Sequence, residues 1–328
     1  MTHGTVADTY SRLMRIFRHY TDLPPDARGV VVAVGNFDGV HKGHQQVIHE
    51  AGTTARALGV PWAVLTFEPH PTSVFRPDSE PFRLTTMRTK MRLIEEMGVD
   101  QILVQHFDKE FASLDADDFI QKVLLDGLGA CHVVSGYDFE FGRGRGGNPD
   151  LLLKRGREKG FGFTAVPAVK DANGIVYSST RVRNELKAAN PRAAAEILGV
   201  AFEIEGRVEH GDKRGRELGF PTANLTMGDY LHPATGIYAV QAGIDEGLDT
   251  KWMDGAGSFG YRPQFDGKHE LMEVYLFDFD GDLYGKHMRV RLIEYLRPEM
   301  KFDGLDELKA QIAADCDQAR EILAQEKR

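Results

Sequence analysis

Apolar runs and amphipathic stretches alternate along the first half of the chain. Runs typical of buried strands lie at 29–35, 61–67, 101–105, 131–135 and 161–168. Stretches with helical spacing of apolar residues or helix-start signals lie between them, at 43–58, 86–97, 115–125 and 148–159. Strands that alternate with helices predict a mostly parallel sheet covered by helices on both faces.

The second half has a different pattern. From about residue 202 the apolar segments are short and β-like, and Gly- and Asp-rich turns separate them, as at 202–210, 236–244, 271–279 and 287–296. This pattern predicts a small antiparallel barrel or sandwich. A final amphipathic helix at 304–326 is expected to pack against it. Its apolar face would consist of Leu305, Leu308, Ile312, Ala319 and Leu323.

An Ala-rich helical segment at 181–200, broken at Asn190-Pro191, separates the two patterns. We therefore predict two domains, residues 15–187 and 202–328, joined by a connector at 188–201. The length of 328 residues agrees with two domains.

Composition excludes several classes of protein. The chain is 42% hydrophobic and has a net charge of −9, from 40 basic and 49 acidic residues. A folded core is expected, whereas a general nucleic-acid binder would show a basic face. No run approaches the about 20 apolar residues that span a bilayer, and the N-terminus lacks a signal-peptide core. The two cysteines, Cys131 and Cys316, form neither a disulfide framework nor a metal set, so we expect a cytoplasmic protein.

The first chemical cluster is GNFDGVHKGH at 35–44, which follows a predicted buried strand and opens a predicted helix. A strand–turn–helix of this kind is the geometry of a phosphate-binding turn, and Gly35, Gly39 and Gly43 permit close approach of backbone to a ligand. His41 and His44 can hydrogen-bond a triphosphate and stabilise charge that develops on its α-phosphate. The alternative is a purely structural turn.

Three further groups in the first half are candidates, each with a structural alternative. The hydroxyl groups and the arginine of YSSTRVR at 177–183 are suited to bind phosphate. The alternative is that this segment is only the start of an ordinary capped helix. Phe67 and Phe75 flank a Pro-rich turn and are suited to stack on a planar ring of a ligand, although aromatic residues in apolar stretches are more often core. Asp138 follows a predicted strand and is suited to hold Mg²⁺ or a hydroxyl group of a ligand.

The second chemical cluster is GRVEHGDKRGRELGFPTANL at 206–225. Its glycines and basic residues suit a nucleotide-cradling loop, and the alternative is a Gly-rich hairpin with surface charges. Thr222 and Asn224 place a hydroxyl and an amide at a rigid turn. Because Mg²⁺ takes few protein oxygen ligands, these two suffice beside ATP phosphates.

Four motifs of the first half, GNFDGVHKGH, TFEPHP (66–71), GYDFEFGRGRGG (136–147) and YSSTRVR, together resemble the bifunctional bacterial riboflavin kinase/FAD synthetase family. The PTAN segment and the stretches GIYAV (236–240), MEVYLFDF (272–279), DLYG and LRPEMKFDGLDELKAQIAAD (296–315) extend the resemblance over essentially the whole chain. It departs from the family pattern at Gln264 and Glu140, which leaves details of the pockets open.

The resemblance implies a Rossmann-like HxGH nucleotidyltransferase domain followed by a β-barrel kinase with a terminal helix. It implies that riboflavin is phosphorylated to FMN with ATP, and that FMN is adenylylated to FAD with release of pyrophosphate. His41 and His44 would serve the second reaction, and Glu273 would be the base of the first. Flavin would contact Phe67, Phe75, Asp138 and Arg297. ATP phosphates would contact Gly35, Asn36, Phe37, Asp38, Gly43, Ser178, Ser179, Thr180, Arg181, Gly211, Lys213, Gly215, Arg216 and Gly219.

Mg²⁺ with ATP is the expected cofactor, and neither nucleic acid nor membrane is an expected partner. In the strand around Glu273, alternation places Glu273, Tyr275 and Phe277 on one face and Met272, Val274 and Leu276 on the other. The alternative is a solvent-facing Glu273 on an edge strand. Two rival functions are a one-activity enzyme whose other module only binds flavin, and a flavin-binding regulator without turnover.

Overall fold

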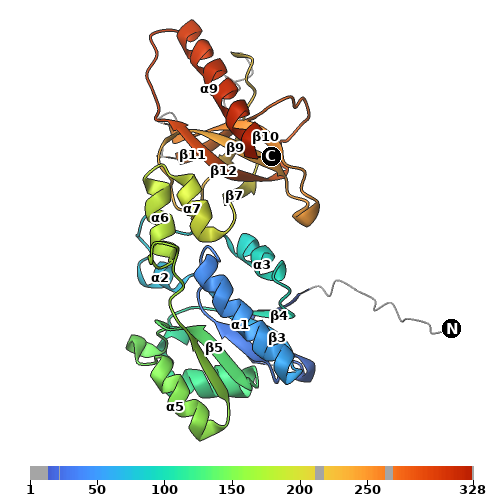
Figure 1. Ribbon diagram of the computed structural model, residues 1–328, viewed down its shortest axis with the longest axis vertical. Coiled ribbons are helices and arrows are strands. Elements are labelled where there is room, and N and C mark those ends of the chain that lie inside the picture. Colours follow the sequence, from blue (N-terminus) through green and yellow to red (C-terminus); the bar gives the residue numbers. More distant parts are fainter. Residues whose placement is uncertain (1–13, 22, 211–217, 263–268, 327–328) are drawn as a thin grey trace, which may run out of the picture. The chain divides into compact units, whose positions relative to one another are not determined.

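The computed structural model describes residues 14–21, 23–210, 218–262 and 269–326, which form two compact units (Figure 1). The first unit comprises the described residues up to Phe37 together with 44–77 and 91–169. The second comprises 38–43, 78–90 and the described residues from 170 onward.

The first unit is built on a parallel six-stranded sheet of order β1-β4-β3-β2-β5-β6. Its strands are β1 (Arg15–Phe17), β2 (Val31–Val34), β3 (Trp62–Glu68), β4 (Gln101–His106), β5 (His132–Gly136) and β6 (Gly162–Val166). The predicted parallel sheet is confirmed, and β1 is an additional short strand. From β2 the chain adds β3 and β4 on one side of the sheet and then β5 and β6 on the other. The order of the strands therefore reverses between β2 and β5, and such a topological switch point is where sheets of this kind bind ligands.

Helices connect these strands where the pattern predicts them, and the short helix α2 is additional. They are α1 (Lys42–Leu58), α2 (Pro71–Phe75), α3 (Met87–Glu95), α4 (Ala116–Asp118), the π-helical segment η3 (Phe119–Gly127) and α5 (Pro149–Lys159). Asp115 and Asn148 cap α4 and α5, since their side chains accept the backbone N–H groups of Asp118 (2.8 Å) and Leu151 (2.9 Å). Short 3₁₀ turns lie at Pro25–Ala27, Phe111–Ser113 and Arg143–Arg145.

The second unit contains an antiparallel sheet of order β7-β12-β9-β10-β11-β8. Its strands are β7 (Phe202–Arg207), β8 (Ala223–Thr226), β9 (Gly236–Ile244), β10 (Met253–Arg262), β11 (His269–Leu276) and β12 (His287–Arg297). A further bridge between Glu209 and Asn224 brings the end of β7 against β8, so the sheet is a nearly closed barrel. The predicted antiparallel barrel is confirmed. A 3₁₀ turn, Gly247–Asp249, follows β9.

The terminal helix α9 (Leu305–Glu326) lies against β9, β10 and β12, as Figure 1 shows. Its buried face consists of Asp315, Cys316, Ala319 and Leu323, so the expected packing on the barrel is confirmed. Leu305 is exposed and does not belong to that face. None of the helices in the described ranges is long and apolar enough to span a bilayer.

The Ala-rich helical segment predicted at 181–200 forms α6 (Ser179–Lys187) and α7 (Pro191–Leu198), which separate at Asn190 as predicted. Val182, Leu186 and Ile197 of these helices share one core cluster with the barrel interior. Leu84, from the segment 78–90, belongs to the same cluster. The compact unit around the barrel therefore includes more of the chain than the strands alone, and the domain boundaries stay a prediction.

Candidate active sites

The turn after β2 belongs to the first unit up to Phe37. The hydroxyl of Thr66 donates to the carbonyl oxygen of Asn36 at 3.1 Å, which ties the turn to β3. Phe37 is buried and has a positive φ of 50°, and its ring leaves no room for a side chain at Gly35. Positive φ at a bulky residue is strained and is concentrated at functional sites.

Two other predicted site residues of this unit are Asp138, near the topological switch point, and His44, at the start of α1. Val34 of β2 pairs with Ser135 of β5, so the chain that carries Asp138 leaves β5 beside the turn after β2. Asp138 is exposed there. His44 lies in the first turn of α1, and its ring packs edge-on against Phe37 with centroids 5.4 Å apart.

The two predicted flavin-stacking residues of this unit differ in exposure. Phe67 is only 6% exposed and lies in an aromatic cluster with Phe107, Phe111 and Phe119, at centroid distances of 5.9, 5.9 and 6.5 Å. Because its ring is enclosed by other rings, the structure favours the core alternative for Phe67. Phe75, at the end of α2, is 64% exposed and therefore accessible to a ligand.

Asp38 opens the part of the motif that belongs to the second unit, and its carboxylate is an anchor. It is 3% exposed and accepts the backbone N–H of Leu84 (3.0 Å) and of Thr85 (3.2 Å). The guanidinium of Arg183, on α6, donates to it at 2.6 Å. These contacts satisfy the buried charge, so Asp38 holds the loop in place; this differs from the predicted direct contact with phosphate.

The loop after Asp38 is a tight turn clasped by residues 84 and 85. Gly39 has a φ of +83° and Val40 one of +42°. The N–H of Gly39 donates to the Thr85 hydroxyl at 3.1 Å, and a side chain at Gly39 would clash with Leu84. Only glycine fits both this conformation and this contact.

His41 immediately precedes α1 and is 6% exposed. Its Nδ1 accepts the backbone N–H of Gly43 at 3.1 Å, so the ring caps the helix. Burial lowers the pKa of His41 to about 4; the Asp38 carboxylate opposes this effect and the Arg183 guanidinium adds to it. His41 is therefore neutral near pH 7, and with Nδ1 accepting, its Nε2–H is the donor.

The second motif forms the start of α6. Ser178 caps the helix by accepting the N–H of Arg181 at 3.2 Å, and the Ser179 hydroxyl donates to the carbonyl oxygen of Asp38 at 2.8 Å. Arg181 forms an ion pair with Asp171 at 2.7 Å, while the Thr180 side chain is exposed. The capped-helix alternative thus applies to Ser178, and the motif also braces the first loop.

The barrel brings two predicted kinase residues together. Glu273 on β11 lies directly opposite Asn224 on β8 and opposite Ser258 on β10. Side chains of directly opposed residues project from the same face of a sheet about 5 Å apart. Because β11 has neighbours on both sides, the edge-strand alternative for Glu273 is wrong. Met272, Val274 and Leu276 are buried on the opposite face, as predicted.

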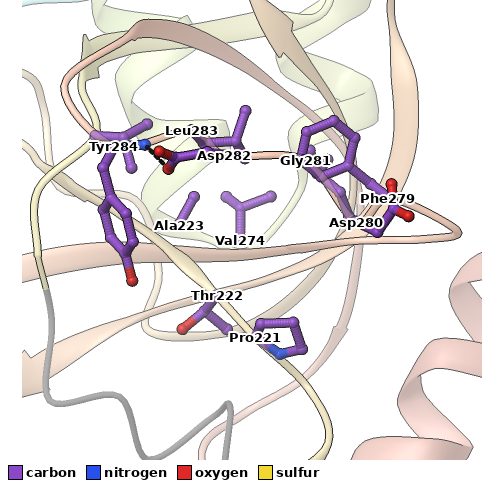
Figure 2. Close-up of a pocket in the computed structure, with 12 residues that line it drawn as sticks. Pro221, Thr222, Ala223, Val274, Phe279, Asp280, Gly281, Asp282, Leu283 and Tyr284 are labelled. Carbon is purple, nitrogen blue, oxygen red and sulfur yellow. Dashed lines mark hydrogen bonds between the residues drawn. The ribbon is translucent and has the colours of Figure 1, made fainter.

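A pocket of about 440 Å³ opens beside this place (Figure 2). Ala223, Val274 and Leu276 form an apolar wall, and Thr222 also lines the pocket. Tyr284 borders the pocket and packs against the ring of His210 at 4.0 Å. The wall belongs to the face of β11 opposite to Glu273, so the predicted base is not among the residues that line this pocket. The pocket's full lining is Val208, Pro221, Thr222, Ala223, Val274, Leu276, Phe279, Asp280, Gly281, Asp282, Leu283 and Tyr284.

Arg297, at the end of β12, makes a bidentate pair with Asp315 of α9, through Nε at 2.8 Å and Nη2 at 2.6 Å. Gln311 also donates to Asp315, at 2.9 Å. Asp315 is a residue that sequence reasoning missed, because nothing in its helix marks it as the partner of Arg297.

Part of the predicted nucleotide loop lies outside the described residues, namely Gly211, Lys213, Gly215 and Arg216. The departure at Gln264 also lies outside them. Gly219 is described; its φ of +91° is a conformation that favours glycine, whereas the space around it is open.

Comparison with known proteins bears on both units. The FAD synthetase family model matches residues 23–181, and the riboflavin kinase model matches residues 198–323. The chain is 41% identical to the bifunctional riboflavin kinase/FMN adenylyltransferase of Escherichia coli (strain K12), over 95% of this chain and 98% of that protein. It is 42% identical to the Pseudomonas fluorescens protein of the same name, with the same coverage.

A solved structure is similar over nearly its whole length. The crystal structure described as a macrolide-efflux protein from Streptococcus pneumoniae is 31% identical, with a TM-score of 0.80 over 92% of this chain and 97% of that one. The family models and the relatives confirm the predicted fold class and the predicted pair of activities. The chain belongs to the family of bifunctional riboflavin kinase/FMN adenylyltransferases.

Proposed function

We propose that the barrel carries the kinase reaction, with Glu273 as its base and with Thr222 and Asn224 as ligands of Mg²⁺. The observation that carries this assignment is the register that sets Glu273 opposite Asn224. The 5′-hydroxyl of riboflavin attacks the γ-phosphorus of ATP, its proton passes to the Glu273 carboxylate, and ADP leaves.

The donor chemistry supports Mg²⁺ at this place. A hydroxyl and an amide carbonyl are hard oxygen ligands, which Mg²⁺ prefers, and it keeps further waters and phosphate oxygens. When bound, the ion neutralises charge on the transferred phosphoryl group. The neighbouring pocket, with its apolar wall and the Tyr284 ring, suits the base and ribose of ATP.

For the adenylyl transfer we propose that His41 and His44 act on the phosphates of a second ATP. The FMN phosphate oxygen attacks the α-phosphorus, and pyrophosphate leaves. The Nε2–H of a neutral His41 is a preorganised donor for charge that develops on the α-phosphate. The position of Asp138 at the switch point and the exposure of Phe75 suit a flavin subsite. Because both reactions consume ATP, the cytoplasm is the proposed location.

A pair of variants tests the kinase assignment. Glu273→Gln keeps the shape of the side chain but cannot accept the proton, so kinase turnover should fall about 100-fold or more. Glu270→Gln, the same change on the same strand, is the matched control and should retain turnover. Kinase turnover of Glu273→Gln equal to that of the control would remove Glu273 from the mechanism.

A further inference from the structure

The segment 83–88 is held from two sides within the second unit. On one side Leu84 and Thr85 donate to Asp38 and enclose Gly39, as described above. These contacts determine where the loop that ends in His41 lies. Leu84 is fully buried, so the segment cannot shift without opening the core cluster of the barrel.

On the other side the segment is bound to the barrel. The Thr86 hydroxyl donates to the Glu205 carboxylate of β7, and Arg88 donates to Asp245, which directly follows β9, with Nε at 2.9 Å. The backbone N–H of Leu231 donates to the carbonyl oxygen of Arg83 at 2.8 Å. The Asp245 side chain is 2% exposed. The Arg88 side chain itself is 60% exposed. Hydrogen bonds to a charged partner are stronger than neutral ones and are directional.

We propose that Glu205 and Asp245, although they lie on the kinase barrel, are positioning residues for the adenylyl transfer. The two carboxylates hold Thr86 and Arg88 in place, and this determines the position of the neighbouring residues 84 and 85. Residues 84 and 85 in turn hold Asp38 and the loop that carries His41. This inference rests on the proposed role of His41. It implies that the adenylyltransferase reaction depends on barrel residues that the kinase reaction does not use.

The same carboxylates have a competing interpretation. Ligand atoms of Glu205, Asp245 and His287 lie within 4.8 Å of one another, a spacing compatible with a metal ion. However, the guanidinium groups of Arg88 and Arg289 already lie at Asp245, the latter at 3.8 Å, and the Thr86 hydroxyl is bound to Glu205. Cations and a donor supplied by the chain itself favour an anchor over a metal site.

The experiment compares both reactions in full-length variants. A misplacement of about 1 Å at a catalytic group can cost about 100-fold in rate. Arg88→Met and Asp245→Asn should each lower kcat for FMN to FAD by about 10-fold or more, with KM for FMN changed little. Riboflavin phosphorylation should stay within about twofold. Arg88→Lys keeps the charge but not the contact through two nitrogens, so it should recover only part of the loss. The double variant should be no worse than Asp245→Asn alone, since both changes remove the contact between Arg88 and Asp245.

The matched control is Asp278→Asn, which removes the partner of Arg320 at the surface of the same unit. It should leave both reactions unchanged. Wild-type FAD synthesis in Arg88→Met and Asp245→Asn would overturn the inference, and so would parallel loss of both activities, which indicates general destabilisation. His41→Ala separates the two claims. If His41→Ala is inactive in FAD synthesis while Arg88→Met and Asp245→Asn are normal, only the positioning role of Asp245 is wrong. If His41→Ala is fully active, the proposed role of His41 is itself wrong.

Discussion

Acid should destabilise the second unit through His41, and the size of the effect follows from its burial. The pKa of His41 is about 4 in the folded protein, against 6.5 for an ordinary histidine. The unfolded chain therefore binds a proton between these pH values and the folded chain does not. Stability is thus lost as pH falls from about 6.5 toward 4. At about 1.4 kcal/mol per pKa unit, the full contribution is about 3 kcal/mol, and about 2 kcal/mol of it is lost by pH 5.

The matched comparison is His41→Asn, because an Asn oxygen can still accept the Gly43 N–H and cap α1 but does not titrate. Trp252 reports on the second unit, since it packs against the guanidinium of Arg291 at 3.6 Å. The only other tryptophan, Trp62, lies in the first unit and can be replaced by Phe in both proteins.

Urea unfolding is then followed by Trp252 fluorescence at pH 7 and pH 5. Between these values the protein with His41 should lose about 2 kcal/mol more than His41→Asn, because all other titrating groups are shared. An equal loss in the two proteins, or a larger loss in His41→Asn, would refute the assignment of a buried neutral imidazole.

Three further predictions concern single contacts. Asp315→Asn should release Arg297, the predicted flavin contact, from its fixed position and so raise KM for riboflavin in the kinase reaction by about 10-fold. An unchanged dependence of the rate on riboflavin concentration would contradict this. Leu84→Ala should lower the free energy of unfolding of the second unit by about 3 kcal/mol, because the side chain is buried against Gly39 and the barrel core; the Trp252 assay measures this, and no loss would be inconsistent with that packing. Thr222→Val should increase the Mg²⁺ concentration for half-maximal kinase rate by about 10-fold and leave FAD synthesis unchanged; an identical Mg²⁺ titration would exclude Thr222 as a ligand.

Local patterns were sufficient to predict most of the fold. Buried apolar runs marked β2 to β6, and the alternation in β11 placed Val274 and Glu273 on opposite faces of the strand. β10 was missed because it contains Gly255, Gly257 and Gly260, which disfavour a strand in isolation. A side chain at Gly255 would lie 2.5 Å from a β11 carbonyl, so glycine is what the close approach requires.

The predicted sites were less complete because their supporting contacts join distant parts of the chain. Arg183 lies 145 positions from Asp38, and Glu205 lies 119 positions from Thr86. No local pattern marks such pairs. For the same reason the motif alone suggested phosphate binding for Asp38, whereas its carboxylate is occupied by the backbone and Arg183. Phe67 was ambiguous because an aromatic residue in an apolar strand suits a core and a stacking site equally.

The central claim, two separate active sites in one chain, is tested most directly by complementation between two inactive variants. Supplied with riboflavin, ATP and Mg²⁺, Glu273→Gln should make almost no product, and His44→Ala should accumulate FMN. An equimolar mixture of the two should produce FAD, measured by chromatography of the flavins over time, because FMN made by one variant is consumed by the other. Failure of the mixture to make FAD would contradict two independent sites, as would loss of both reactions in either variant.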